Sequence, residues 1–195
     1  MPHDGVPDMR RSVDDDGAMG DQLEGMDYVT RFSKLIERGK TILDVGCGDG
    51  LPVDAYLVKQ DLAVNGIDAS ERMIELARRN VPEGFYEVKD MLDLKRGEYC
   101  VDGILSLRAM LHIPHAKYRA LLKNFASFMP NGGALLLTMR SDEGGQAGED
   151  PAGSMAPHDA ADDNTELLED AGFTILLNDI DASGGEKHQI ILARS

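Results

Sequence analysis

The residues best suited to chemistry lie in one short segment, residues 43–50, with the sequence Leu-Asp-Val-Gly-Cys-Gly-Asp-Gly. Its three glycines follow an apolar run, so we expect a strand that ends in a tight loop. Glycine has no side chain and tolerates positive φ, which lets such a loop come very close to a ligand. Asp68 lies 22 residues after Gly46, at the end of a second apolar run. Loop and acid together predict a ligand held by backbone and one carboxylate.

The spacing of these residues limits the class of ligand that the loop would bind. In Rossmann-type folds, a carboxylate about 20 residues beyond the glycine loop accepts hydrogen bonds from a ribose diol. A dinucleotide-binding loop, Gly-x-Gly-x-x-Gly, would need glycine at position 51, where this chain has leucine. A nicotinamide-dependent oxidoreductase is therefore the less favoured alternative. The order Asp-x-Gly-x-Gly-x-Gly, which begins at Asp44, instead resembles motif I of the class I S-adenosyl-L-methionine (SAM) dependent methyltransferases.

Further segments continue this resemblance in the order that the family shows. They cover a second motif around the acid at 68, a third motif, the fourth strand with a substrate-facing turn, a Pro-Asn-Gly-Gly turn into the fifth strand, and the end of the last helix. Together they span roughly residues 41 to 194. The segments are residues 65–70, 89–93, 101–114, 129–137 and 167–173.

The resemblance implies an α/β fold, a Rossmann-like doubly wound sheet of seven strands, mostly parallel with an antiparallel last strand. The residue pattern agrees, because strand signals alternate with helix signals, as in a parallel sheet covered by helices. Asp163 with Glu166 resembles a capping box at the start of the last helix. Strands are expected at 41–45, 62–67, 85–88, 101–107, 134–139, 173–180 and 187–193, and helices at 26–38, 51–59, 70–79, from Pro114 onward and from 163 to Gly172.

The resemblance assigns cofactor roles to the residues that match its motifs. Asp68 would bind the ribose hydroxyls; its alternative role is a helix N-cap near Ser70. Asp90 would accept from the adenine amino group, although Asp93 is a near neighbour that could replace it. Asp44 would orient the loop and the SAM amino group. The remaining cofactor contacts would be Gly46, Cys47, Gly48, Ala69, Met91, Leu92 and Leu107.

Methyl transfer requires an acceptor aligned with the SAM methyl carbon and, for some acceptors, a base. His112 follows the fourth strand at the expected site edge and is our catalytic candidate, with a packing role as the alternative. Arg108 would either bind an acidic acceptor or pair with a surface acid. Tyr28 would be an acceptor contact from the N-terminal part of the chain.

Composition limits the partners. The chain has 35 acidic and 20 basic residues and a formal charge of −15, which disfavours nucleic acid and anionic membranes. No apolar run approaches the ~20 residues that span a bilayer, and the N-terminus does not look like a signal peptide. Cys47 and Cys100 form neither a metal motif nor a disulfide framework, so we expect a reducing, cytoplasmic location and no bound metal.

The chain is long enough for one domain, which we place at residues 26–195. Residues 1–25 carry few large apolar groups and are expected to be disordered or loosely docked. Residues 141–161 are a lid candidate, with a plain surface insertion as the alternative. Both segments are poor in aromatic residues. The function we expect is methyl transfer to a small soluble acceptor, with binding of SAM or S-adenosyl-L-homocysteine (SAH) without transfer as the alternative.

Overall fold

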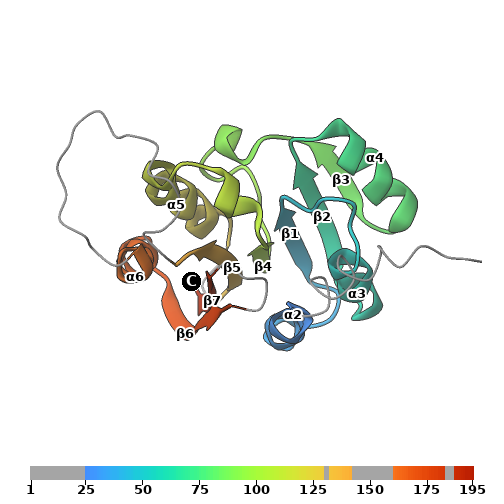
Figure 1. The fold of residues 1–195 in the computed structure, drawn as a ribbon. Helices are drawn as coiled ribbons and strands as arrows, with labels where there is room; N and C mark the ends of the chain where they lie inside the picture. Colours follow the sequence, from blue (N-terminus) through green and yellow to red (C-terminus); the bar gives the residue numbers. More distant parts are fainter. Residues whose placement is uncertain (1–24, 130–131, 142–159, 183–186) are drawn as a thin grey trace, which may run out of the picture.

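The computed structural model describes residues 25–129, 132–141, 160–182 and 187–195, and they form one seven-stranded sheet flanked by helices (Figure 1). The strand order is β3-β2-β1-β4-β5-β7-β6. Neighbours from β3 to β5 pair in parallel, and β7 runs antiparallel to both β5 and β6. The predicted fold class is therefore confirmed. The strands are β1 Thr41–Val45, β2 Ala63–Asp68, β3 Phe85–Val88, β4 Gly103–Ser106, β5 Ala134–Arg140, β6 Thr174–Asp181 and β7 His188–Arg194.

Helices cover both faces of the sheet (Figure 1). On one face lie α2 (Met26–Ser33), α3 (Val53–Lys59) and α4 (Glu71–Asn80). On the other lie α5 (Tyr118–Phe128) and α6 (Ala160–Asp170). Three 3-10 turns, η1 (Met91–Asp93), η2 (Ala109–His112) and η3 (His115–Lys117), connect strand ends to helices. Among the described helices, none combines the length and the apolar character that crossing a membrane requires.

Side chains along the central strands point alternately to the two faces of the sheet, and this produces two separate apolar layers. Ile42 packs toward α2 and α3, whereas Leu43 and Val45 pack toward α5. The α5 side of the core contains the helical stripe expected from the sequence, since Leu121, Leu122, Phe125 and Phe128 are all buried. Asp44 falls between Leu43 and Val45, so its side chain enters the layer under α3. Strand periodicity thus forces a carboxyl group into the interior.

Several predicted boundaries differ from the structure. The capping box is wrong, because α6 begins at Ala160 and Asp163 therefore lies inside the helix. The helix expected from Pro114 begins at Tyr118, since Pro114 is extended (ψ 135°) and only the short turn η3 follows it. The first helix ends at Ser33, before the predicted residue 38. The prediction for residues 1–24, and that for residues 142–159 of the lid candidate 141–161, lie outside the described residues.

A buried polar network fixes α6 to the ends of β5 and β7. The Asn164 side chain is fully buried, and its amide donates to the Arg140 carbonyl (2.7 Å) and to Gln189 Oε1 (2.8 Å). Its Oδ1 lies 3.1 Å from His115 Nε2, and Gln189 in turn donates to Asn178. Buried polar groups of this kind are costly when a partner is lost. We infer that Asn164 locks this helix, and His115 with it, onto the sheet.

Asn164→Ala should therefore lower the free energy of unfolding by about 2–3 kcal/mol, because it removes the donor to the Arg140 carbonyl and to the buried Gln189 Oε1. Urea denaturation monitored by circular dichroism measures this. Glu169→Ala, on the exposed side of the same helix, is the matched control and should change stability by less than about 0.5 kcal/mol. Equal effects of the two substitutions would show that the network does not stabilise the fold.

Candidate functional site

The loop after β1 and the end of β2 are tied together by backbone and carboxylate contacts. The amides of Gly46 and Cys47 both donate to the Ile67 carbonyl, at 2.7 and 3.0 Å. The Gly48 amide donates to Asp68 Oδ2 at 3.1 Å. The Asp68 carboxylate thus lies directly over the glycine loop, at the carboxyl edge where ligands of open α/β sheets bind.

The other oxygen of Asp68 faces the start of α4. Asp68 Oδ1 accepts from the Ser70 amide at 2.8 Å, and the Ser70 hydroxyl accepts from the Met73 amide at 3.4 Å as the N-cap of the helix. Ser70, rather than Asp68, therefore caps α4. The carboxylate of Asp68 is held between two backbone donors, in an orientation that exposes part of it to the cavity described below.

Gly46 and Gly48 of the loop both require glycine, but for different physical reasons. Both have positive φ, +80° at Gly46 and +56° at Gly48. A Cβ on Gly46 would lie 2.2 Å from the Cβ of Ala109, so this glycine lets the loop touch the turn after β4. A Cβ on Gly48 would meet nothing within 4 Å. The space above Gly48 is open, and a ligand can approach its backbone there.

A cavity of about 240 Å³ lies at this edge of the sheet. It brings together six residues predicted from the sequence, although they come from four separate segments. It also contains three that sequence reasoning missed, Lys89, Ala109 and Ile113, because only the folded turns place them there. The six predicted residues are Gly46, Asp68, Ala69, Asp90, Met91 and His112.

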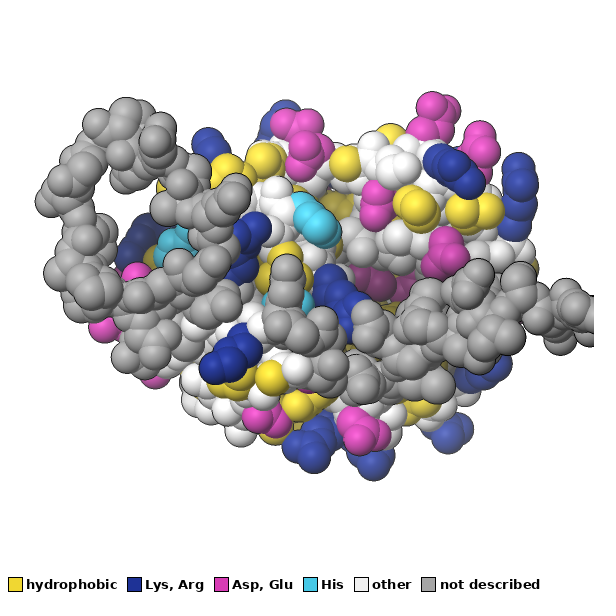
Figure 2. Space-filling model, in the orientation of Figure 1, with side chains coloured by type: hydrophobic (Ala, Val, Ile, Leu, Met, Phe, Trp, Pro, Cys, Tyr) yellow, Lys and Arg dark blue, Asp and Glu magenta, His cyan; other side chains and the backbone are white. Residues whose placement is uncertain are grey.

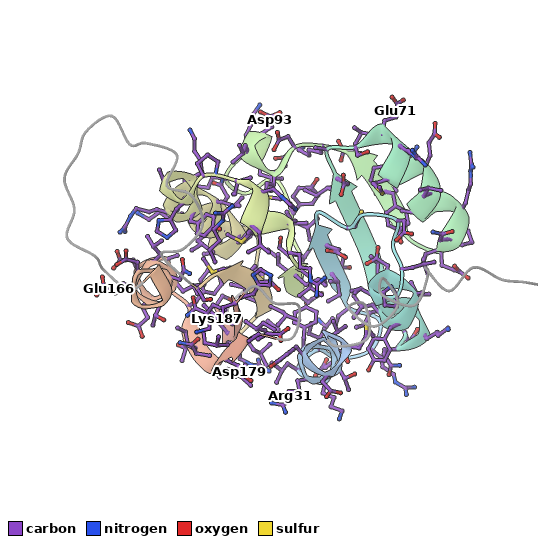
Figure 3. All side chains as sticks on the ribbon, in the orientation of Figure 1. Arg31, Glu71, Asp93, Glu166, Asp179 and Lys187 are labelled. Carbon is purple, nitrogen blue, oxygen red and sulfur yellow. The ribbon has the colours of Figure 1, made fainter. Side chains whose placement is uncertain are left out.

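Asp90 is fixed by the turn that follows it. Its Oδ1 accepts from the Leu92 amide at 2.8 Å and so begins η1. Asp93, the alternative, is exposed and lies at the outer rim of the molecule in Figure 3, while Asp90 lines the cavity. Leu92 is 44% exposed and is absent from the cavity lining.

The turn after β4 is anchored on both sides. The Tyr118 hydroxyl donates to the Met110 carbonyl at 2.9 Å. The Arg140 guanidinium donates twice to the Leu111 carbonyl, at 3.1 and 2.8 Å. These contacts hold His112 at the cavity, with its side chain exposed. His115, by contrast, belongs to the Asn164 network.

A second cavity, of about 150 Å³, lies next along the same edge. Leu107 and Arg108 line it, and the residues that follow them line the first cavity, so the two meet at the turn after β4. Tyr28 of α2 also lines this cavity, so three residues predicted from the sequence to contact cofactor or acceptor lie here. The other contributors come from the start of α3 and from the sheet, and they include Leu51, Pro52, Thr138 and His188.

Tyr28 is linked to the far edge of the sheet. Its hydroxyl donates to Asp179 Oδ2 at 2.8 Å, and Figure 3 shows Asp179 of β6 on the side of α2. Burial and the hydrogen bond to Asp179 raise the pKa of Tyr28 to about 12. This phenol therefore stays protonated at neutral pH and serves as a donor, not as a base.

Asp44 lies beneath the loop and faces a second buried acid, Asp54, which sequence reasoning missed. Asp44, Gly66 and Tyr86 are neighbours in one row across β1, β2 and β3. A Cβ on Gly66 would lie 2.5 Å from the Tyr86 ring, so this glycine lets the ring fold over the sheet toward α3. Asp54 lies three residues before Leu57 on the buried face of that helix, and this spacing was the signal in the sequence.

Both acids hold protons more tightly than usual. Burial, followed by the charge of Asp54, raises the pKa of Asp44 well above its ordinary range. Burial raises the pKa of Asp54 to about 6. Because these groups are close and interact, the proton belongs to the pair and not to one residue.

Cys47 points into the small apolar cluster between α3 and α4 and lines neither cavity. Burial and the nearby carboxylates raise the pKa of its thiol far above the ordinary value. The thiol is thus neutral and acts in packing. Its backbone amide, bonded to Ile67, is what shapes the loop.

Comparison with known proteins agrees with this geometry. A family model for a methyltransferase domain matches residues 42–133, the segment from β1 to the start of β5 that builds the first cavity. Over these residues, slightly less than half of the chain, the sequence therefore matches a methyltransferase domain.

Curated relatives of this methyltransferase domain are O-methyltransferases. A ubiquinone biosynthesis O-methyltransferase of Coxiella burnetii is 31% identical over 105 residues, which are 52% of this chain and 44% of the relative. O-methyltransferase cnsE of Penicillium expansum is 29% identical over 152 residues, 71% of this chain and 54% of the relative. The chain thus spans about half the length of the curated relatives it matches.

Solved structures share the fold of this methyltransferase domain. Magnesium protoporphyrin IX methyltransferase from Synechocystis, with bound SAH, superposes with a TM-score of 0.71, at 23% identity and over 99% of this chain and 90% of that one. The [4+2]-cyclase SpnF superposes with a TM-score of 0.69, at 17% identity and over 88% and 80%. At these identities the likeness establishes the fold alone.

Gly48→Ala should weaken binding of SAH at least tenfold, because the new methyl group enters the space where a ligand would approach the backbone. Isothermal titration calorimetry measures the change. Gly39→Ala is the matched control, since Gly39 also has positive φ (+76°) with nothing within 4 Å of a Cβ, and it lies at the opposite end of β1. Both variants carry the same backbone strain, so equal binding by the two would disprove contact between the loop and the ligand.

Proposed function

We propose that this protein transfers the methyl group of SAM to a small-molecule acceptor and releases SAH. The observation that carries the proposal is the first cavity, where the glycine loop, Asp68, Asp90 and His112 line one space. The family match over the same segment supports it. The names of the relatives support a small-molecule acceptor.

The residues present fit this cofactor along its length. The Asp68 carboxylate is placed to accept from the ribose hydroxyls, next to Ala69. Asp90 would accept from the adenine amino group, with Met91 as apolar cover. The open space over Gly48 would suit the amino-acid end, with the ammonium directed toward the buried carboxyl of Asp44. Leu107, in the second cavity, would be the contact nearest the acceptor.

The chemistry requires alignment more than activation. When bound, SAM supplies an electrophilic methyl group on a sulfonium that leaves as a neutral thioether. The turn after β4 then positions the acceptor, because it lines both cavities. For a hydroxyl acceptor, His112 accepts the proton as the oxygen gains the methyl group, and it passes that proton to solvent. The rigid anchoring of this turn keeps the base in place.

The second cavity fits an acceptor with an apolar body and a polar or anionic end. Leu51, Pro52 and Leu107 supply apolar contact, Tyr28 supplies a neutral phenol, and Arg108 supplies positive charge. Elsewhere the chain is strongly acidic, and acidic and basic side chains are interspersed over the coloured part of the face in Figure 2. A large polyanion such as nucleic acid is therefore a poor candidate for the acceptor.

The alternative is a protein that binds SAM or SAH without methyl transfer. The specific observation in its favour is the similarity in fold to a protein named as a cyclase, since a fold does not fix the reaction. A nicotinamide cofactor is less suitable, because Leu51 stands where its loop would need glycine and lines the second cavity instead.

A turnover assay separates these functions. We expect SAH to form from SAM only in the presence of an acceptor, with hydroxylated ring compounds tested first, followed by ring nitrogens and carboxylic acids. Calorimetry with SAM, SAH and NAD is run in parallel. Binding of SAH without turnover of any acceptor would favour the alternative, and binding of NAD alone would overturn the proposal.

With a working acceptor, His112→Ala should lower kcat by about 10²–10⁴-fold and change SAM affinity little, because a base acts mainly in the transition state. Lys117→Ala, an exposed change in the adjacent turn η3, is the matched control and should turn over at the parent rate. A parent-like rate for His112→Ala would exclude His112 as the base and leave the reaction dependent on alignment alone.

A further inference from the structure

We propose that Asp44 and Asp54 form a charge-sensing pair beneath the glycine loop, which shares one proton in the free protein and releases more of it when SAM binds than when SAH binds. The inference rests on the proposed function and extends it, because it assigns to this chain a means of telling substrate cofactor from product. Asp54 would be a positioning and specificity residue, since it acts on the cofactor through charge and not through contact.

The geometry of Asp54 is the first argument. Its side chain is fully buried, and neither carboxylate oxygen has a hydrogen-bond partner among the described residues. The Tyr86 hydroxyl beside it is likewise without one. A Cβ on Gly50, the last glycine of the loop, would lie 3.4 Å from Asp54 Oδ2 and 3.3 Å from that hydroxyl. The acid is therefore directed at the underside of the loop, with Asp44 and the Tyr86 hydroxyl as its polar neighbours.

The groups around the pair compensate its charge only in part. Burial raises the pKa of Asp54 by more than the Tyr86 hydroxyl lowers it. Asp68 raises the pKa of Asp44 by charge repulsion, and Asp49 does the same for Asp54. The Cys47 thiol and the Tyr86 phenol are neutral, since the pKa of each is raised by burial. Arg78 of α4 donates from Nη2 to the backbone carbonyl of Tyr86 at 2.7 Å. Two ionised carboxylates in such surroundings repel each other, so one proton is retained.

A cation placed above the loop reverses this balance. SAM carries a sulfonium and an ammonium, whereas SAH carries only the ammonium. The ammonium, which both ligands carry, favours the ionised pair in both complexes. The sulfonium adds a second positive charge, so the pKa of the pair is lowest in the SAM complex. The proton then passes to solvent as SAM binds. Once the sulfonium has become a thioether, the pair takes a proton back from solvent, and the attraction for the product weakens.

The affinity for SAM should therefore depend on pH. Because the pKa of the pair is higher in the free protein than in the SAM complex, proton release makes SAM bind more tightly as pH rises. SAH, which lacks the sulfonium, should show a smaller change. From about pH 5.5 to about pH 8, the ratio of SAM to SAH affinity should rise roughly tenfold, as expected for a difference of one pKa unit.

Calorimetric titration of the full chain tests this. At each pH, SAM and SAH are titrated in buffers with different ionisation enthalpies, which yields the number of protons released on binding. Near pH 6 we expect more proton release with SAM than with SAH, and a difference of one pKa unit between the two complexes corresponds to at most about half a proton. Equal release with the two ligands would overturn the inference. If neither ligand binds, the proposed function fails and the inference fails with it.

The variant that isolates the pair is Asp54→Asn. It removes one acid and keeps the shape, so proton release should disappear and the affinity ratio should become independent of pH. Asp61→Asn is the matched control: it removes the same charge from the exposed end of α3, where φ is +66° and asparagine is well tolerated. His112 is present in both variants, so its own protonation cancels. An unchanged pH dependence in Asp54→Asn would overturn the proposal.

A measurement on the unmodified chain covers the case in which Asp54→Asn fails to fold. Carboxyl carbon NMR follows the ionisation of the aspartates in the free protein and in the two complexes. The proposal requires two aspartate carboxyl signals that titrate together near or above pH 6 in the free protein and that ionise at a lower pH with SAM than with SAH. Identical titration in both complexes would contradict it.

Discussion

The site depends on the contact between two loops, the one after β1 and the one after β4. They touch at Gly46 and Ala109, so closely that a Cβ on the glycine would lie 2.2 Å from that of the alanine. Parallel strands bring the two loops to the same edge of the sheet, and a glycine with positive φ allows them to meet. Without this contact, Asp68 at the end of β2, Asp90 after β3 and His112 after β4 would not line one cavity.

Other elements serve to keep this contact in place. Tyr118 and Arg140 hold the second loop through its carbonyls, and Asn164 attaches α6 to the same corner. The first loop is held by the Ile67 carbonyl and by Asp68. Beneath it, the fold buries two carboxyl groups, which burial alone would disfavour. We attribute their retention to the positive charge that the site is proposed to receive.

Sequence reasoning worked where one local rule dominated. The glycine loop and Asp68 could be placed because glycine spacing and strand periodicity act over short distances. The start of α6 was wrong, because Asp163 with Glu166 fits a capping pattern that the helix overrides by starting at Ala160. Lys89, Ala109 and Ile113 were missed because their place in the cavity arises only when separate turns fold together. Asp54 was missed because its burial depends on how α3 packs against the sheet, which the pattern of the glycine loop does not reveal.

The central claim is that a SAM-type cofactor lies along the first cavity, and the most direct test is an amide NMR titration of the full chain with SAH. The account predicts that the largest shifts occur at Gly46, Gly48, Ala69 and Met91, and that Gly48 shifts because its amide now shares Asp68 with the ribose. Gly39, at the far end of β1, should not move. Saturable binding that leaves the Gly48 and Met91 amides unshifted would contradict the account.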